Sequence, residues 1–348
     1  MFRKVLLPAT LFALSAVVAY AQPAGKLAGG PYVVRVRPDR ATVAWVLEFT
    51  EGGKSVLRAQ KLAISGLNPG KTYHYDLLGK DEGKGYFKSA PDGASPFRFA
   101  VFGDTRTRHE VHQNVVNAME KSEPDFVLHT GDLVADGTKT EQWPVFFGIE
   151  RELLRKTAFF PALGNHERND PKFYEFFDIE KPYYSFRWGN AYFVILNSDL
   201  GNAASNEEER KAFWEEQSQW LEAELVKSQE AGFRFVVFHH PPITAVKRRQ
   251  GEKHPVQEWM PLFEKYKVTA VFNGHDHNYQ HHIRNGVHYI VTGGGGAPLY
   301  EVDAPVPGVT QTVEKIEHFV VIEVDGSKAR LEAKALDGRL IERIDFNP

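Results

Sequence analysis

A change of pattern near residue 97 constrains the fold of this chain more than any other feature. From that point on, short apolar runs alternate with longer segments in which apolar residues recur at helical spacing. The strand candidates are residues 97–102, 126–129, 184–196, 233–238, 269–272 and 287–291, and the helix candidates are residues 110–121, 205–229 and 256–266. Alternating strands and helices are typical of an α/β domain. Two closing segments, 319–324 and 329–335, indicate further strands, so we expect this domain to cover residues 97–348.

The residues before this domain have a different pattern. Between Pro31 and about Ala90, short alternating apolar runs are separated by turn residues, notably Asn68-Pro69-Gly70. Such runs predict a small all-β domain, which we assign to residues 22–92. The polar and turn-rich stretch around residues 91–96 is expected to link the two domains.

The amino terminus has the three parts of an export signal. Basic Arg3 and Lys4 precede an apolar stretch at residues 5–18, and the small-x-small triplet Ala19-Tyr20-Ala21 follows. We therefore expect residues 1–21 to be a signal peptide and the mature chain to be periplasmic or secreted. The alternative is a permanent membrane anchor, but the apolar run is shorter than the roughly 20 residues that span a bilayer. No cysteine is present, so the exported chain has neither disulfide bonds nor a lipid-modified cysteine.

The overall charge argues against a polyanionic partner. The chain has 42 lysine and arginine residues against 45 aspartate and glutamate residues, a formal net charge of −3. No global basic field exists to attract nucleic acid or an anionic membrane surface. We therefore expect neither as a partner, and recognition of phosphate must be local. The sequence leaves the oligomeric state open.

Five short polar clusters carry the chemistry of the sequence, most of them directly after an apolar run. They are Gly103-Asp104-Thr105-Arg106, Gly131-Asp132, Gly164-Asn165-His166-Glu167, His239-His240-Pro241 and Gly274-His275-Asp276-His277. Strand ends at one edge of an α/β sheet are where such folds place their sites. Oxygen ligands from Asp and Asn with imidazoles from His suit Zn, Fe, Mn or Ni, whereas copper(I) or an iron–sulfur cluster would require sulfur. Each cluster alone is a weak signal, but the ordered set indicates a metal site.

In order and residue type, these clusters resemble the motifs of the calcineurin-like metallophosphoesterase superfamily. The pattern is Asp-x-His, Gly-Asp, Gly-Asn-His-Asp/Glu, a His before x-Pro, and Gly-His-x-His, and the resemblance covers roughly residues 97–296. The stretch 66–75 also resembles a strand corner of the fibronectin type III-like domains that precede the catalytic domain in purple acid phosphatases. The resemblance implies a four-layer α/β sandwich, with two mixed β-sheets flanked by helices, preceded by a small all-β sandwich. At about 65 residues the N-terminal part is shorter than the roughly 100 of an ordinary sandwich, so fewer strands are expected there.

The same resemblance implies a binuclear centre of divalent or trivalent Fe, Mn or Zn ions. Asp132 would bridge the two ions. One site would be completed by Asn165, His239 and His275, and the other by Asp104 and His277. His239 matches the family ligand better than His240 does, because the proline follows it after one residue.

The implied reaction is hydrolysis of a phosphate ester by a metal-bound hydroxide. Two divalent ions about 3.5–4 Å apart neutralise the charge of the ester, lower the pKa of a bridging water and hold the nucleophile in line. His166 corresponds to the catalytic histidine of the family, which donates a proton to the departing alkoxide. Glu167 is expected to orient His166. The products would be an alcohol and phosphate or a phosphomonoester.

Two positions depart from the family pattern. The histidine expected two residues after Asp104 is Arg106, and the tyrosine that purple acid phosphatases have three residues after the bridging aspartate is Ala135. An arginine offers five donors and no accepting lone pair, so Arg106 cannot replace the histidine as a ligand. We expect Arg106 to hold the phosphate of the substrate and to make the two metal sites unequal.

Two functions remain open at this point. The first is a phosphomonoesterase or phosphodiesterase, whose substrate class the motifs do not specify. The second is a metal-binding but catalytically weak scaffold that binds a partner or a polysaccharide, and Arg106 keeps this alternative open. Asn165 and His166 favour the enzyme, because a scaffold does not need a leaving-group acid. The basic run Lys247-Arg248-Arg249 is interpreted as a solvated loop rather than a binding site for a polyanionic substrate.

Overall fold

The computed structural model describes residues 16–17, 25–77, 79, 81–252 and 254–346. The predicted signal peptide lies outside these residues, apart from the short strand β1 (Ala16–Val17), which pairs in parallel with β5 (Thr72–Asp76). None of the helices in the described part of the chain is long and apolar enough to cross a membrane.

The larger main sheet has nine strands in the order β19-β18-β17-β7-β8-β9-β2-β3-β4. Its centre is parallel and consists of β7 (Phe97–Phe102), β8 (Phe126–His129) and β9 (Ala158–Pro161). Antiparallel strands extend it beyond β7, namely β17 (His318–Asp325), β18 (Lys328–Ala335) and β19 (Leu340–Phe346). N-terminal strands extend it beyond β9, namely β2 (Lys26–Val34), β3 (Arg40–Glu51) and β4 (Lys54–Ser65).

The second main sheet has seven strands in the order β10-β11-β12-β13-β15-β14-β16. Its parallel strands are β11 (Ala191–Ile195), β12 (Phe233–Val237), β13 (Ala270–Asn273) and β15 (Val287–Thr292). Its antiparallel strands are β10 (Tyr184–Trp188), β14 (Tyr279–Arg284) and β16 (Thr310–Glu314).

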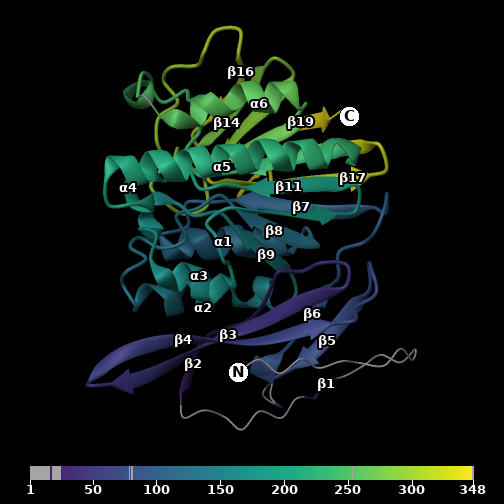
Figure 1. Cartoon of the computed structure of the whole chain (residues 1–348), viewed down its shortest axis with the longest axis vertical. Helices are drawn as coiled ribbons and strands as arrows, with labels where there is room; N and C mark the ends of the chain where they lie inside the picture. The colour runs from purple at the N-terminus through teal and green to yellow at the C-terminus, as the bar shows by residue number, and fades with distance from the viewer. Residues whose placement is uncertain (1–15, 18–24, 78, 80, 253, 347–348) are drawn as a thin grey trace.

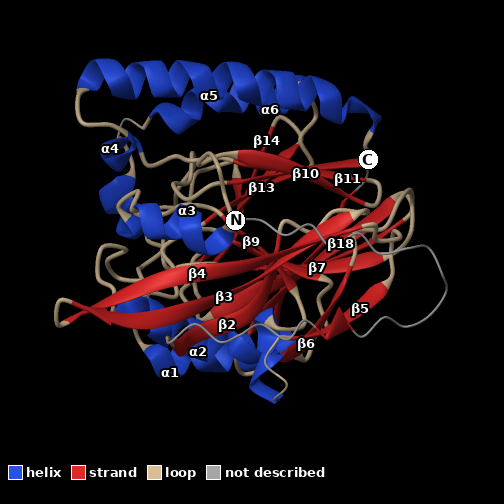
Figure 2. Cartoon of the chain, turned by 60° about the horizontal axis from the view of Figure 1, so that its bottom comes forward, coloured by secondary structure: helices blue, strands red, loops and turns tan. Residues whose placement is uncertain are grey.

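Helices cover the outer faces of both sheets, which gives four layers (Figures 1 and 2). The nine-stranded sheet packs on α1 (His109–Glu120), α2 (Gln142–Leu154) and α3 (Pro171–Phe177), and the seven-stranded sheet packs on α5 (Glu207–Lys227) and α6 (Met260–Lys265). Between the sheets, Phe99 of β7 meets Phe193 of β11 and Phe235 of β12 edge to face, with ring centroids 5.2 and 5.3 Å apart. Edge-to-face pairs are a favoured aromatic geometry. The predicted arrangement of two mixed sheets flanked by helices is confirmed.

The N-terminal strands form the predicted β part and divide between two sheets. Val33 of β2 pairs with Ala158 of β9, so β2, β3 and β4 continue the nine-stranded sheet. In contrast, β5 and β6 (Lys84–Lys88) form a separate antiparallel hairpin. The hairpin buries Tyr75 and Phe87 in the same core as Val43 of β3. The small sandwich therefore shares one of its layers with the α/β domain, as Figure 1 shows at the purple end of the chain.

Three differences separate the structure from the expected elements. The run 184–196 is a hairpin of β10 and β11 rather than one strand, because the chain turns at Gly189, whose φ is 58°. The long helix, expected over residues 205–229, begins at Glu207 and is capped by Asn206, which accepts from Glu209 N at 2.9 Å. The elements α2, β9 and α3 were not expected. The remaining short helices are α4 (Leu200–Ala203), η1 (Asp81–Gly83), η2 (Asn165–Glu167), η3 (Ser228–Glu230), η4 (Lys247–Arg249) and η5 (Pro255–Trp259).

Candidate metal centre

The predicted ligands follow the carboxyl ends of the parallel strands in both sheets. Asp104 follows β7, Asp132 follows β8, Asn165 follows β9, His239 follows β12, and His275 and His277 follow β13. Asp104, Asp132 and His275 each have a left-handed backbone, with φ of 59°, 60° and 68°. Non-glycine residues adopt this conformation rarely, and it turns their side chains sharply out of the strand direction. The glycine before Asp132 is required, since a Cβ at Gly131 would lie 2.8 Å from the backbone of Gly164.

One group of ligand atoms belongs to Asp104, Asp132 and His277, and these atoms all lie within 4.8 Å of one another. All three side chains are buried, and Oδ1 of Asp104 lies 3.3 Å from Nε2 of His277. The Nδ1 of His277 is 2.7 Å from the carbonyl oxygen of Pro298. Because a carbonyl oxygen only accepts, Nδ1 carries the proton, and the lone pair of Nε2 faces Asp104. Metal-bound histidines are oriented in this way.

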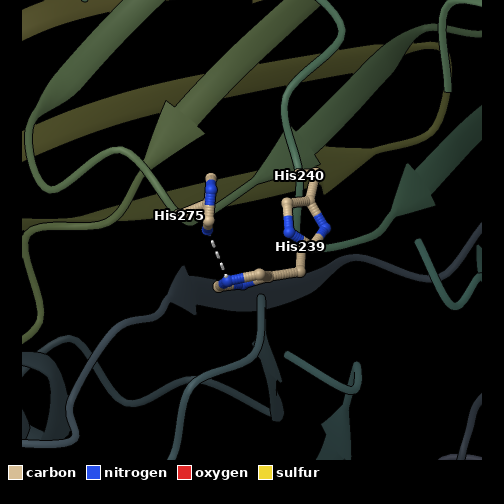
Figure 3. A group of neighbouring side chains, drawn as sticks. All are labelled: His239, His240 and His275. Atoms are coloured by element: carbon tan, nitrogen blue, oxygen red, sulfur yellow. Dashed lines mark hydrogen bonds between the residues drawn. The ribbon is translucent and has the colours of Figure 1, made fainter. Parts of the chain in front are cut away.

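A second group surrounds the imidazole of His239. Its Nε2 lies 3.1 Å from Oδ1 of Asn165, 3.1 Å from Nδ1 of His275 and 3.4 Å from Oδ1 of Asp132. Its Nδ1 is 2.9 Å from the carbonyl oxygen of Thr130, so the lone pair of Nε2 again faces the centre. Figure 3 shows the hydrogen bond between His239 and His275, with His240 beside them. Asp132 thus contacts both groups, and the structure brings all six predicted ligands together.

The electrostatics of the two groups favour a bound cation. Burial and the neighbouring Asp104 carboxylate raise the pKa of Asp132 to about 7. Burial also acts on Asp104, but pairing with His277, when that ring is protonated on both nitrogens, holds the pKa of Asp104 below the ordinary value. Oδ1 of Asp104 is buried and has no hydrogen-bond donor in the described structure. A metal ion would supply the missing partner and relieve the repulsion between the two carboxylates, so these residues fit a metal.

His166 lies beside the centre with one nitrogen facing it. Its Nδ1 donates to the carbonyl oxygen of Ala135 at 2.6 Å, and its Nε2 lies 3.8 Å from Oδ2 of Asp132. Ala135 occupies the position at which purple acid phosphatases have a tyrosine, and its backbone carbonyl oxygen orients His166. The backbone N–H of His166 also donates to Oδ1 of Asp132 at 3.0 Å.

The expectation that Glu167 orients His166 is wrong. Glu167 is fully buried, and its carboxylate accepts from the backbone N–H groups of Asp132, Leu133 and Gly164 at 2.8–2.9 Å. Burial and the nearby Asp132 raise the pKa of Glu167 to about 8. Glu167 therefore ties the loop that carries Asp132 to the turn after Gly164, and it has no oxygen directed at a substrate.

Arg106 points into the first group of ligands. Its Nε lies 3.4 Å from Oδ2 of Asp132, and a terminal nitrogen lies 3.5 Å from Nε2 of His277. The guanidinium therefore lies between the two residues that a metal at this position would bind. A fixed positive charge already faces these ligands.

A family model described as calcineurin-like phosphoesterase matches residues 97–279. The chain belongs to the calcineurin-like phosphoesterase family. The matched residues begin with β7 and extend past His277, so they contain all six predicted ligands.

Relatives of this calcineurin-like phosphoesterase include purple acid phosphatases. It is 27% identical over 267 residues to an uncharacterized protein of Mycobacterium tuberculosis, covering 64% of this chain and 50% of that protein. It is 27% identical over 248 residues to purple acid phosphatase 5 of Arabidopsis thaliana, covering 68% of this chain and 58% of that protein. The structure of purple acid phosphatase PPD1 from yellow lupin matches with a TM-score of 0.74 at 19% identity, covering 93% of this chain and 75% of that one. The chain shares this fold, and it spans about half the length of the first curated relatives it matches.

Three residues of this calcineurin-like phosphoesterase join the centre although the sequence did not single them out as part of it. His240 lies against His275, with ring centroids 4.2 Å apart. Arg249 contacts Nε2 of His275, and Tyr300 stacks on His277 with centroids 4.0 Å apart. Arg249 belongs to the basic run interpreted as a solvated loop, which is wrong for this residue, because its side chain is only 16% exposed. No local signal in the sequence marks Tyr300.

Proposed function

We propose that this chain hydrolyses phosphate esters at a metal centre built on Asp132. The observation that supports the proposal most is the position of the Asp132 carboxylate. Its Oδ1 lies 3.4 Å from Nε2 of His239, and the same side chain belongs to the group with Asp104 and His277. A carboxylate shared by two ligand groups is what a bridging ligand requires. The metal ligands are Asp104, Asp132, Asn165, His239, His275 and His277.

The donor set suits two Fe, Mn or Zn ions, because it consists of carboxylate and amide oxygens and imidazole nitrogens. Metal ions bound there would neutralise the charge of the ester and lower the pKa of a water nucleophile. Asp132, Asn165, His239 and His275 hold the tighter site. Asp104 and His277 hold a weaker one, because Arg106 stands where a further ligand is needed.

Two side chains act on the substrate in this proposal. His166 protonates the leaving oxygen through Nε2, since its Nδ1 already donates to Ala135. Arg106 binds oxygens of the reacting phosphate, for which its planar fork of donors is suited. Water attacks phosphorus, the bond to the ester oxygen breaks, and an alcohol leaves with the proton from His166.

The division of the chain is part of the proposal. Residues 1–21 are a signal peptide, residues 22–92 an N-terminal β domain related to the fibronectin type III-like domains of purple acid phosphatases, and residues 97–348 the phosphoesterase domain. The mature protein acts in the periplasm or outside the cell. The basic Arg3-Lys4 start and the triplet 19–21 support export.

Hydrolysis of p-nitrophenyl phosphate and of its bis ester by the mature protein, with Mn²⁺, Fe²⁺ or Zn²⁺ added, tests the proposal. We expect hydrolysis of at least one ester, and the pair distinguishes a monoesterase from a diesterase. Asp132→Ala should abolish the activity, whereas Asp39→Ala, at a side chain that is 68% exposed in the N-terminal part, should retain it. Metal binding without hydrolysis of either ester would favour the scaffold alternative.

A further inference from the structure

A hollow of about 330 Å³ lies where the N-terminal strands meet the α/β domain. Its lining combines Arg35 and Arg37, from the turn between β2 and β3, with residues of β9, of the segment 177–184 and of α5. None of the six candidate ligands is among its lining residues. The hollow is therefore not part of the metal centre.

The hollow opens because β2 and β9 pair over a single position. Val33 pairs with Ala158, and β2 ends one residue later. Arg35 then has a left-handed backbone with φ of 52°, a conformation that turns a non-glycine residue out of the strand direction. In the described structure the rest of β9, residues 159–161, has no pairing partner in β2, and these residues face the hollow.

One wall of the hollow is aromatic. It consists of Phe159, Phe160, Phe177, Tyr183, Tyr184 and Trp220. The hydroxyl groups of the two tyrosines donate elsewhere, that of Tyr183 to Oε1 of Glu216 at 2.6 Å and that of Tyr184 to the carbonyl oxygen of Pro161 at 2.9 Å. The wall therefore offers mainly apolar ring surface, against which a ring of a ligand packs well.

The lining also contains five charged side chains, and all of them except Arg37 are in ion pairs. The pairs are Arg35 with Glu180 at 3.1 Å, Asp178 with Lys61 at 2.9 Å, and Lys181 with Glu216 at 2.7 Å. Both carboxylates of the lining are thus offset by cations other than Arg37.

Arg37 has no such counter-ion. Within the described residues no carboxylate lies at ion-pair distance from its guanidinium, which donates to the carbonyl oxygen of Ser185 at 2.8 Å and lies 5.6 Å from the ring centroid of Phe186. Burial lowers the pKa of Arg37 from 12.5 to about 10, and the charges of Arg40 and Arg35 act in the same direction. Arg37 is therefore still charged at neutral pH. A partly buried charge without a partner is unfavourable, and an anion in the hollow would supply the partner.

We propose that this hollow binds a small aromatic carboxylate, whose charged group pairs with Arg37 and whose ring packs against the aromatic wall. A guanidinium matches a carboxylate with two parallel hydrogen bonds. The volume lies at the lower end of the range of about 300–1,000 Å³ for small-molecule pockets, which suits a ligand with one ring. Arg37 belongs to the N-terminal part and the aromatic wall to the α/β domain, so the ligand contacts both. The inference does not depend on the proposed function.

Three probes separate the contribution of the ring from that of the charge. Benzoate carries both, benzamide has nearly the same shape without the charge, and acetate has the charge without the ring. Calorimetric titrations of the wild-type protein measure the three dissociation constants. We expect benzoate to bind about tenfold more tightly than benzamide, the change that one charge-assisted hydrogen bond produces, and acetate to bind more weakly than benzoate.

Variants locate the bound probe. Arg37→Gln should weaken benzoate about tenfold, to the level of benzamide, and Arg37→Lys should keep part of the difference. Trp220→Ala should weaken benzoate and benzamide alike, because it removes part of the wall and not the charge. The control is Arg40→Gln, which removes a nearby positive charge that is 65% exposed and outside the lining, and it should bind benzoate as the wild-type protein does.

Equal dissociation constants for benzoate and benzamide in the wild-type protein would overturn the inference, and this result does not require any variant to fold. Benzoate binding that is unchanged in Arg37→Gln would overturn it as well, because the carboxylate would then lie elsewhere, for example at the metal centre. These titrations measure binding alone, so a failure of the proposed function leaves their outcome unaffected.

Discussion

The guanidinium Nε of Arg106 lies 3.4 Å from Oδ2 of Asp132, and a terminal nitrogen lies 3.5 Å from Nε2 of His277, so its positive charge faces the group of Asp104, Asp132 and His277. A divalent ion about 5 Å from a guanidinium is repelled by about 7 kcal/mol at an effective dielectric constant near 20, before bridging anions are counted. We therefore expect the proposed site of Asp104 and His277 to bind its ion more weakly than the proposed site at His239. A phosphate reverses this effect, because its oxygens accept hydrogen bonds from the same guanidinium.

Arg106→His should make the two metal sites more nearly equal. A neutral imidazole removes the repulsion and supplies a lone pair. The ion at Asp104 and His277 should therefore stay bound during a dialysis that removes it from the wild-type protein. The KM for phosphate esters should rise at the same time, because the fork of donors is lost. Metal analysis after dialysis and steady-state kinetics measure both effects. Two equally tight ions in the wild-type protein would contradict the role given to Arg106.

His166→Ala should lower turnover by about 10²–10⁴-fold, the usual loss for a general acid, and leave the metal content near normal. The loss should be smaller for nitrophenyl esters, because an acidic leaving group needs little protonation. Rates on an alkyl ester and on p-nitrophenyl phosphate, with metal analysis of both proteins, provide the measurement. Equal losses on the two esters would show that His166 has a structural role only.

Stability should fall in acid partly because of His282, which is buried away from the metal ligands. Its Nδ1 and Nε2 lie 2.9 and 3.0 Å from Oγ1 of Thr310 and Oε1 of Gln280. Burial and then the charge of His281 lower the pKa of His282 from 6.5 to about 4. The unfolded chain therefore takes up a proton below about pH 6.5 that the folded chain takes up only near pH 4. The resulting contribution of His282 to the free energy of unfolding is present at neutral pH and is lost between about pH 6.5 and pH 4. It amounts to at most about 3 kcal/mol.

Thermal melts of the wild-type protein and of His282→Gln between pH 7.5 and 4 test this linkage. Glutamine retains a donor and an acceptor but does not titrate, so the melting temperature of the variant should fall less steeply below pH 6.5. Parallel curves for the two proteins would show that His282 contributes nothing to acid destabilisation.

Export with cleavage after Ala21 should leave Gln22 as the first residue. Amino-terminal sequencing of the protein recovered from its host, after separation of the cell fractions, decides this point. Retention of Met1 in the cytoplasm would contradict it.

The α/β layers could be predicted from the sequence because their central strands are buried on both faces. The expected segments 97–102 and 126–129 coincide with β7 and β8, since a strand covered by helices on one side and a sheet on the other is mostly apolar. The short elements were harder to predict. In α3 three phenylalanines are buried in seven residues, and a helix of two turns gives little periodic signal.

The candidate ligands could be predicted because each stands in a short motif after a strand. The contacts around them could not, since they join residues distant in sequence. Arg249 meets His275, and Tyr300 stacks on His277, because the chain brings distant loops together. No shared sequence motif marks these loops. The error at Glu167 has a simple cause. Consecutive residues in a helical turn do not face each other, so Glu167 points into the protein while His166 points towards the centre.

The dependence of hydrolysis on metal at the Asp132 centre tests the central claim most directly. One preparation of the mature protein is assayed with p-nitrophenyl phosphate before chelation, after removal of metal and after addition of Mn²⁺. Its melting temperature and metal content are measured at each stage. We predict that activity disappears with the metal and returns with it, and that the melting temperature falls in the metal-free protein, because bound metal stabilises only the folded state. Full activity in protein shown to be free of metal would contradict the account.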